Sequence, residues 1–157
     1  MKIAVLKEQA AGETRVALTP ETAKKFIALG AEVSVEAGAG ETAAIADSAY
    51  RDAGVTVGTA AEVIKDAGIV LGVQAPDPAA LSGAKPGAKV AALFDPFRDG
   101  ARVEAYASAG YEALSMEFMP RITRAQSMDV LSSQSNLSGY KAVIAAADQY
   151  GRAFPMM

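Results

Sequence analysis

The sequence predicts an α/β fold in which helices cover a doubly wound, mostly parallel sheet. Short apolar runs bounded by Gly, Pro or charged residues alternate along the 157 residues with helical patterns. Such runs are typical of strands buried on both faces of a parallel sheet. Hydrophobic residues make up 51% of the chain, and a domain of this length buries roughly 70% of the surface of its unfolded chain. We therefore expect one Rossmann-like or flavodoxin-like domain spanning residues 1–157.

Five segments have the composition of buried strands: residues 2–6, 32–36, 69–73, 89–94 and 111–116. Helical patterns lie between them. In the first helix, Thr19 is expected as the N-cap and Pro20 at the first helical position, and Gly30 ends the helix. The residues of this helix that should face inward are Phe26, Ile27 and Leu29.

Three further helices are expected. Thr59 and Glu62 have the spacing of a capping box, and Gly68 follows that helix. Another helix covers residues 100–109. The last is a long C-terminal helix over residues 137–154, whose shared apolar face consists of Leu137, Tyr140, Val143, Ile144 and Ala147.

The composition excludes several classes of function. The chain has no cysteine, so it offers no disulfide, thiolate nucleophile or sulfur-ligated metal, and we expect no metal. It has no histidine, the commonest general base, which disfavours proton-transfer enzymes. A formal net charge of −3 indicates no nucleic-acid surface. No apolar run reaches the roughly 18 residues of a bilayer span and the amino terminus has no leader pattern, so we expect a cytoplasmic protein.

Four segments follow predicted strands at the edge where parallel sheets bind ligands: residues 7–15, 74–78, 94–97 and 120–136. Arg15, in the first, has the geometry to clamp a carboxylate; alternatively it forms an ion pair with Glu13 or Glu21. Asp95, in the third, either accepts hydrogen bonds in a site or belongs to an ordinary turn before Pro96. The sequence alone leaves both pairs of alternatives open.

The stretch "EAGAGETA", residues 36–43, partly matches the dinucleotide-binding fingerprint, with Ala43 in place of its third glycine. The fingerprint belongs to the first turn of such a domain and should open a helix, whereas Ile45, Asp47 and Ser48 indicate a loop before a short helix. We interpret the glycines as turn residues with positive φ, with phosphate binding as the alternative. The chain is thus expected to lack a dinucleotide site of its own.

The stretch "PRITRAQSMDVLSSQSN", residues 120–136, is unusually polar and long for a connection. Arg121, Gln126 and Asp129 place a cation, an amide and an anion within nine residues, and Ser132 follows three residues later. Arg and Asp together supply the donor and the acceptor that a nicotinamide carboxamide needs. Alternatively, the segment is a solvated loop in which Asp129 caps the next turn and pairs with Arg121.

Two stretches resemble a known family. "PRITRAQSMDVLSSQSNLSGYKAVI" resembles the loop of the NAD(H)-binding component, the N-terminal domain of the alpha subunit, of proton-translocating NAD(P) transhydrogenases. "KIAVLKEQAAGETRVALTPE" is similar to a signature that this component shares with alanine dehydrogenase. The resemblance implies direct hydride transfer between NADH and NADP⁺, coupled elsewhere to proton translocation. It implies that Arg121, Asp129 and Ser132 contact the carboxamide end of NAD(H) and that Gln126 reaches toward NADP(H), which makes these four the expected cofactor-binding and catalytic residues.

The resemblance also implies partners. In the family, a following Rossmann domain with GxGxxG binds most of NAD(H); because this chain lacks it, we expect the chain alone to be inactive. The other implied partners are a second copy in a homodimer and the membrane and NADP(H)-binding components. They would place the chain at the cytoplasmic face of the bacterial inner membrane. The absence of histidine agrees with this chemistry, since hydride transfer between two nicotinamides needs only their apposition.

Two other functions stay open. Enzymes of the alanine dehydrogenase type use a lysine and a histidine where this sequence has Gln74 and Phe94. That function is therefore disfavoured, although Arg15 of the same substrate triad is kept. The remaining alternative is a catalytically inert interaction domain, in which the polar segment 120–136 would be only a docking surface.

Overall fold

The computed structural model describes residues 1–154. They form two compact units, Met1–Met116 and the residues from Glu117 onward, which we call unit 1 and unit 2 and describe separately. Unit 1 contains the whole sheet, and unit 2 contains the longest helix of the described residues.

Unit 1 is built on one sheet of six parallel strands in the order β3-β2-β1-β4-β5-β6. The strands are β1 Lys2–Val5, β2 Glu32–Glu36, β3 Thr56–Gly58, β4 Ile69–Gln74, β5 Lys89–Leu93 and β6 Glu112–Ser115. The predicted α/β class is confirmed, and five strands match the expected segments to within one residue at each end. The sequence did not indicate β3, because three residues at a sheet edge are too few to show a period.

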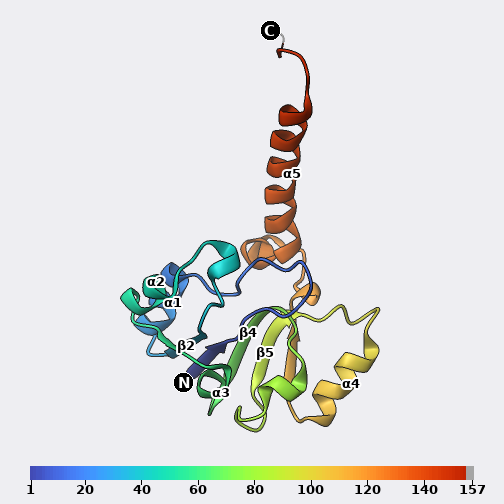
Figure 1. Cartoon of the computed structure of the whole chain (residues 1–157). Helices are drawn as coiled ribbons and strands as arrows, with labels where there is room; N and C mark the ends of the chain where they lie inside the picture. Colours follow the sequence, from blue (N-terminus) through green and yellow to red (C-terminus); the bar gives the residue numbers. More distant parts are fainter. Residues whose placement is uncertain (155–157) are drawn as a thin grey trace. The chain divides into compact units, whose positions relative to one another are not determined.

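Helices pack on both faces of this sheet. They are α1 Pro20–Ala28, α2 Asp47–Asp52, α3 Ala60–Ile64 and α4 Gly100–Ser108, with short 3-10 helices η1 Glu41–Ala43, η2 Pro78–Leu81 and, at the boundary between the units, η3 Met116–Phe118. Figure 1 shows α1 and α2 beside β2, and α4 on the β5 side of unit 1.

The core of unit 1 consists of two layers, one on each face of the sheet. On one face, Ala4 and Val70 pack with Ile64 of α3, Leu81 of η2 and Tyr106 of α4. The second layer contains Val5, Val33 and Val35 from the strands, Ala23 from α1 and Tyr50 from α2. Adjacent residues of β1 therefore point into different layers, as the alternation of a strand requires.

The sequence explains α1 in detail. The Thr19 hydroxyl accepts a hydrogen bond from the backbone N–H of Thr22, at 3.3 Å, Pro20 is the first helical residue, and Gly30 has a φ of +85°. The expectation that Leu29 faces inward is wrong, since its side chain is 83% exposed. The helix ends at Ala28 and Leu29 is its C-cap, so the helical period no longer directs this side chain to the core.

The capping box of α3 is confirmed. The Thr59 hydroxyl accepts from the Glu62 N–H at 3.4 Å, and the Glu62 carboxylate accepts from the Thr59 N–H at 2.8 Å. The helix is shorter than predicted, because Lys65 already leaves the helical conformation and Asp66 has a φ of +58°. Three non-helical residues, 65–67, thus separate α3 from Gly68.

Unit 2 contains the 3-10 helix η4 Thr123–Met128 and α5 Val130–Gln149. The long C-terminal helix is confirmed, but it starts at Val130 instead of residue 137, so most of the predicted polar loop is helical. The cause is Asp129, whose side chain caps α5. No helix of residues 1–154 is long and apolar enough to cross a bilayer.

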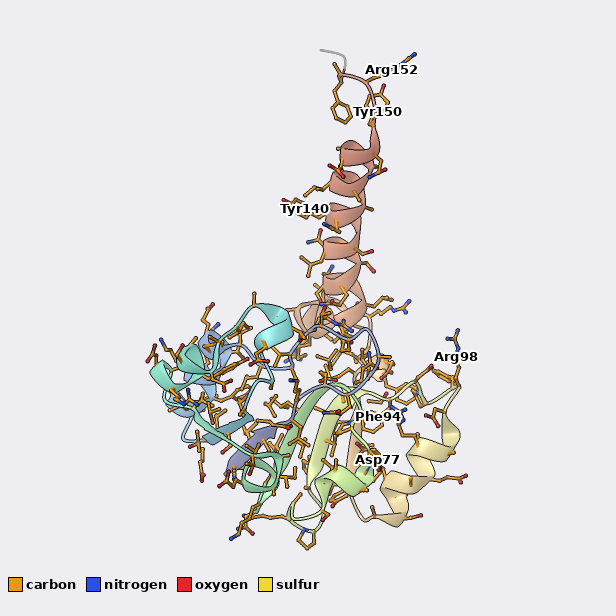
Figure 2. The ribbon with its side chains drawn as sticks, viewed as in Figure 1. Asp77, Phe94, Arg98, Tyr140, Tyr150 and Arg152 are labelled. Carbon is orange, nitrogen blue, oxygen red and sulfur yellow. The ribbon has the colours of Figure 1, made fainter. Side chains whose placement is uncertain are left out.

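The predicted apolar face of α5 is exposed, including Leu137, Tyr140, Val143 and Ile144. The ring of Tyr140 points away from the helix in Figure 2. The helix ends five residues before the predicted end, where Tyr150 turns to an extended conformation. Beyond it, the rings of Tyr150 and Phe154 stack with their centroids 5.2 Å apart.

Replacing Tyr50 by Phe tests the hydrogen bond that ties α2 to the segment before α1. The Tyr50 hydroxyl, fully buried, donates to the Leu18 carbonyl at 2.6 Å. Removal of this donor leaves the carbonyl unpaired, so we expect a loss of about 1–3 kcal/mol in the free energy of unfolding in urea. Tyr140→Phe, at an exposed position, is the matched control, and equal stability of the two variants would contradict the prediction.

Candidate functional site

The order of the strands reverses at β1, which is flanked by β2 and β4. In open parallel sheets this switch point is where ligands bind, beyond the carboxyl ends of the strands. A crevice of about 320 Å³ lies there in unit 1, and its lining includes residues 6–10, Gln74 to Asp77, and Arg102 of α4. The prediction that the segments after β1 and β4 line one crevice is therefore confirmed.

Glu8 fixes the wall of this crevice, and sequence reasoning did not single it out. Its two carboxylate oxygens accept from the backbone N–H groups of Val73, at 2.6 Å, and Gln74, at 3.1 Å. The pairing of β4 with β5 shifts register between Leu71 and Gln74, so these amides need a partner outside the ladder. Burial raises the pKa of the Glu8 carboxyl, partly offset by the two backbone donors.

Arg15 and Gln74 converge on Glu13. The guanidinium donates to both oxygens of the Glu13 carboxylate, at 2.7 and 2.6 Å, and the Gln74 amide donates to one of them at 3.2 Å. The hydrogen bonds from Arg15 lower the pKa of Glu13 to about 2, against a smaller effect of burial. Of the predicted alternatives for Arg15, the ion pair with Glu13 is the one observed, while Glu21 pairs with Lys25.

Phe94 and Asp95 have structural roles in unit 1. The Phe94 side chain is 1% exposed, and its ring meets that of Tyr106 edge to face with centroids 4.9 Å apart; Figure 2 shows it inside the unit, with Arg98 at the surface. Asp95 has a φ of +48°, and its carbonyl accepts from the N–H groups of Arg98 and Asp99. This geometry is the predicted turn.

The glycines of residues 36–43 also form a turn. Gly38 has the expected positive φ of +75°, and its N–H donates to Asp47 at 2.9 Å. For Gly40 the expectation is wrong, since its φ is −90°. Glycine is needed there because an added Cβ would lie 2.6 Å from the Ile45 carbonyl oxygen. The helix that follows, η1, has three residues, so the turn lacks the helix N-terminus on which a phosphate is held.

In unit 2, Asp129 and Ser132 are in direct contact. Oδ1 of Asp129 accepts from the Leu131 N–H at 3.0 Å, and Oδ2 accepts from the Ser132 hydroxyl at 2.6 Å. The Ser132 hydrogen bond is the main cause that lowers the pKa of Asp129, and the charge of Arg121 adds to it. Gln126 connects to this pair through its backbone, whose carbonyl accepts from the Asp129 N–H at 3.4 Å.

The predicted cap at Asp129 is thus observed, but its predicted ion pair with Arg121 is absent from the salt bridges of residues 1–154. Arg121, Gln126 and Ser132 are exposed, whereas Asp129 is buried. Within the same described range, no group of three or more acidic side chains is placed to hold a metal ion.

These features define a class: a doubly wound, all-parallel α/β unit followed by a polar segment that leads into a long helix. Residues 4–138 match the family described as alanine dehydrogenase/PNT, N-terminal domain. The chain belongs to this family.

Relatives of known sequence and structure include several transhydrogenases. The chain is 48% identical to the first portion of NAD(P) transhydrogenase subunit alpha from Rhodospirillum rubrum and 44% identical to that from Rickettsia prowazekii, in each case over 100% of this chain and 42% of the relative. A crystal structure of transhydrogenase from Sinorhizobium meliloti superposes with a TM-score of 0.92 at 50% identity, covering 100% of this chain and 47% of that one.

An L-alanine dehydrogenase structure is more distant, with a TM-score of 0.72 and 25% identity over 80% of this chain and 34% of its own. The chain spans less than half the length of each of these relatives.

The lowered pKa of Glu13 predicts how stability depends on pH. Its folded-state value of about 2 lies below the usual range of an unfolded glutamate, so its contribution is present above about pH 4.5 and is lost as the pH falls toward 2. Glu13→Gln should therefore be less stable than wild type at neutral pH, and the difference should shrink between pH 4.5 and 2 in urea unfolding. Glu21→Gln, in an exposed pair with Lys25, is the control; if both variants follow the wild-type profile, the prediction is wrong.

Proposed function

We propose that this chain is the N-terminal domain of the NAD(H)-binding component of a proton-translocating transhydrogenase. In this proposal its polar segment, residues 120–136, lies at the nicotinamide during direct hydride transfer between NADH and NADP⁺. The observation that carries the proposal is the likeness to transhydrogenase over the whole chain, at 50% identity and a TM-score of 0.92.

The residues of unit 2 fit a nicotinamide carboxamide. Arg121 is exposed and offers guanidinium donors for the carboxamide oxygen, while Ser132 and Asp129 offer acceptors for its NH₂ group. Gln126 is exposed in η4 and carries both a donor and an acceptor. We assign it to the NADP(H) side of the same site.

Bound NADH supplies the hydride, and the chain's own side chains hold and orient the ring. Transfer of a hydride between two nicotinamides consumes and releases no proton, so the site needs no general acid or base. Its contribution is apposition and orientation of the rings. A chain without histidine or cysteine suits this chemistry.

The phosphates and the adenosine of NAD(H) need a cradle elsewhere. In unit 1 the glycine turn of residues 36–43 uses its Gly38 N–H internally and opens only a three-residue 3-10 helix. We therefore assign the dinucleotide cradle to a Rossmann domain in the further length that the relatives have. The membrane and NADP(H)-binding components and a second copy of the component complete the proposed assembly, at the cytoplasmic face of the bacterial inner membrane.

A second candidate function is that of an amino-acid dehydrogenase of the alanine dehydrogenase type. The likeness to an L-alanine dehydrogenase structure favours it. Against it, the two positions assigned to a lysine and a histidine carry Gln74, which is bonded to Glu13, and Phe94, which is a core residue. Alanine-dependent reduction of NAD⁺ by the complete protein would support this candidate over transhydrogenase.

Gln126→Asn tests the proposed role of the polar segment. Shortening the side chain by one methylene leaves the amide in place but withdraws it from the second nucleotide. In the complete transhydrogenase we expect hydride transfer to slow by about 10- to 100-fold through lost orientation, with nearly unchanged affinity for NADH. Stopped-flow absorbance measures the transfer step. Gln149→Asn, at the far end of α5, is the matched control, and unchanged transfer in Gln126→Asn would contradict the proposal.

Calorimetric titration of the 157-residue chain with NADH tests where the cradle lies. Because the described glycine turn provides no phosphate site, we expect no binding in the micromolar range, whereas the complete subunit should bind. Micromolar binding by the chain alone would overturn the assignment and direct attention to the turn at residues 36–43.

A further inference from the structure

The hydrogen bonds around Asp129 restrict what the proposed site can offer a ligand. An ionised carboxylate only accepts hydrogen bonds, and the Ser132 hydrogen bond, helped by Arg121, lowers the pKa of this group. Both oxygens of Asp129 are already engaged, Oδ1 by the Leu131 N–H and Oδ2 by the Ser132 hydroxyl. The side chain is also buried, with 8% of the residue exposed. Asp129 therefore has little capacity left for a ligand.

The same contact fixes the polarity of Ser132. A serine hydroxyl has one hydrogen and two lone pairs. Because Asp129 cannot donate, the hydrogen of Ser132 must lie in their 2.6 Å contact. The outward side of the exposed Ser132 oxygen thus presents lone pairs only, and it can accept a hydrogen bond but not donate one.

We propose, building on the function proposed above, that Ser132 accepts the hydrogen bond from the carboxamide NH₂ of NAD(H), and that Asp129 is a positioning residue that keeps Ser132 in this accepting state. The pair then determines specificity for a primary amide over a carboxylate. A carboxylate has no hydrogen to give Ser132, and the negative charge of Asp129 disfavours it further.

Arg121 cannot supply this specificity. Its guanidinium donates to an amide oxygen and binds a carboxylate at least as well. Selection of the amide therefore has to come from an acceptor, and in the described residues of unit 2 the Asp129–Ser132 contact provides one with a fixed direction.

The test compares two ligands in the complete transhydrogenase: NADH and its nicotinic acid counterpart, in which a carboxylate replaces the carboxamide. The measured quantity is the ratio of their dissociation constants, from fluorescence titration. Ser132→Ala should reduce the preference for NADH by about 3- to 10-fold, the effect of one neutral hydrogen bond. Ser133→Ala is the matched control, since its hydroxyl bonds only to the carbonyls of Asp129 and Val130 among the hydrogen bonds of residues 1–154, and it should keep the wild-type ratio.

Asp129→Asn separates a positioning role from direct contact. Asn keeps a cap oxygen for α5, while its NH₂ donates to Ser132 and releases the serine hydrogen outward. We expect the preference for the amide to fall at least as far as in Ser132→Ala. In the Ser132→Ala background the same substitution should leave the ratio unchanged. Circular dichroism of each variant checks that α5 is intact.

The outcomes distinguish the two levels of the proposal. If Asp129→Asn changes the ratio equally with and without Ser132, Asp129 contacts the ligand itself and the inference is wrong. An unchanged ratio in Ser132→Ala also overturns it, and the proposed function then stands provided Gln126→Asn still slows hydride transfer. If Gln126→Asn has no effect either, the proposed function fails together with the inference.

Discussion

The architecture of unit 1 depends on β1, a four-residue strand that must be apolar on both faces. Ala4 and Val5 are fully buried in opposite core layers, and β1 pairs with β2 on one edge and β4 on the other. The order of the strands reverses here, so the segments after β1 and β4 lie side by side and enclose the crevice. Glu8 then becomes necessary, because the amides at the irregular end of β4 need an acceptor that the ladder does not supply.

Local signals predicted most of the fold, and long-range contacts account for what they missed. Thr19 with Pro20, and Thr59 with Glu62, act within one helical turn, so the sequence reveals them directly. β3 is stabilised only by pairing with β2, and Glu8 acts on residues 65 and 66 positions away. No pattern confined to a short window carries such information. Leu29 failed for a different reason, since the period was right but the helix ended one residue earlier.

The candidate site was predictable in its residue types but not in its geometry. The serine-rich stretch after Asp129 has weak helix propensity, which favoured a loop, yet capping by Asp129 extends α5 back to Val130. Sequence reasoning treated capping and ligand binding by Asp129 as alternatives. The structure indicates that they are compatible, because one carboxylate both starts the helix and orients Ser132. That coupling depends on the direction of a single hydroxyl, which residue spacing cannot reveal.

The all-parallel pairing of the sheet has a consequence for biosynthesis. Without hairpins between neighbouring strands, each pairing waits for a crossover, and Ile3 of β1 finds its partner Ile69 in β4 only after the intervening segment has left the ribosome. At roughly 5–20 residues per second this takes several seconds. During that time one edge of an apolar strand stays open, which exposes it to chaperones and to pairing with other nascent chains. The strand that is made first is thus among the last to be enclosed.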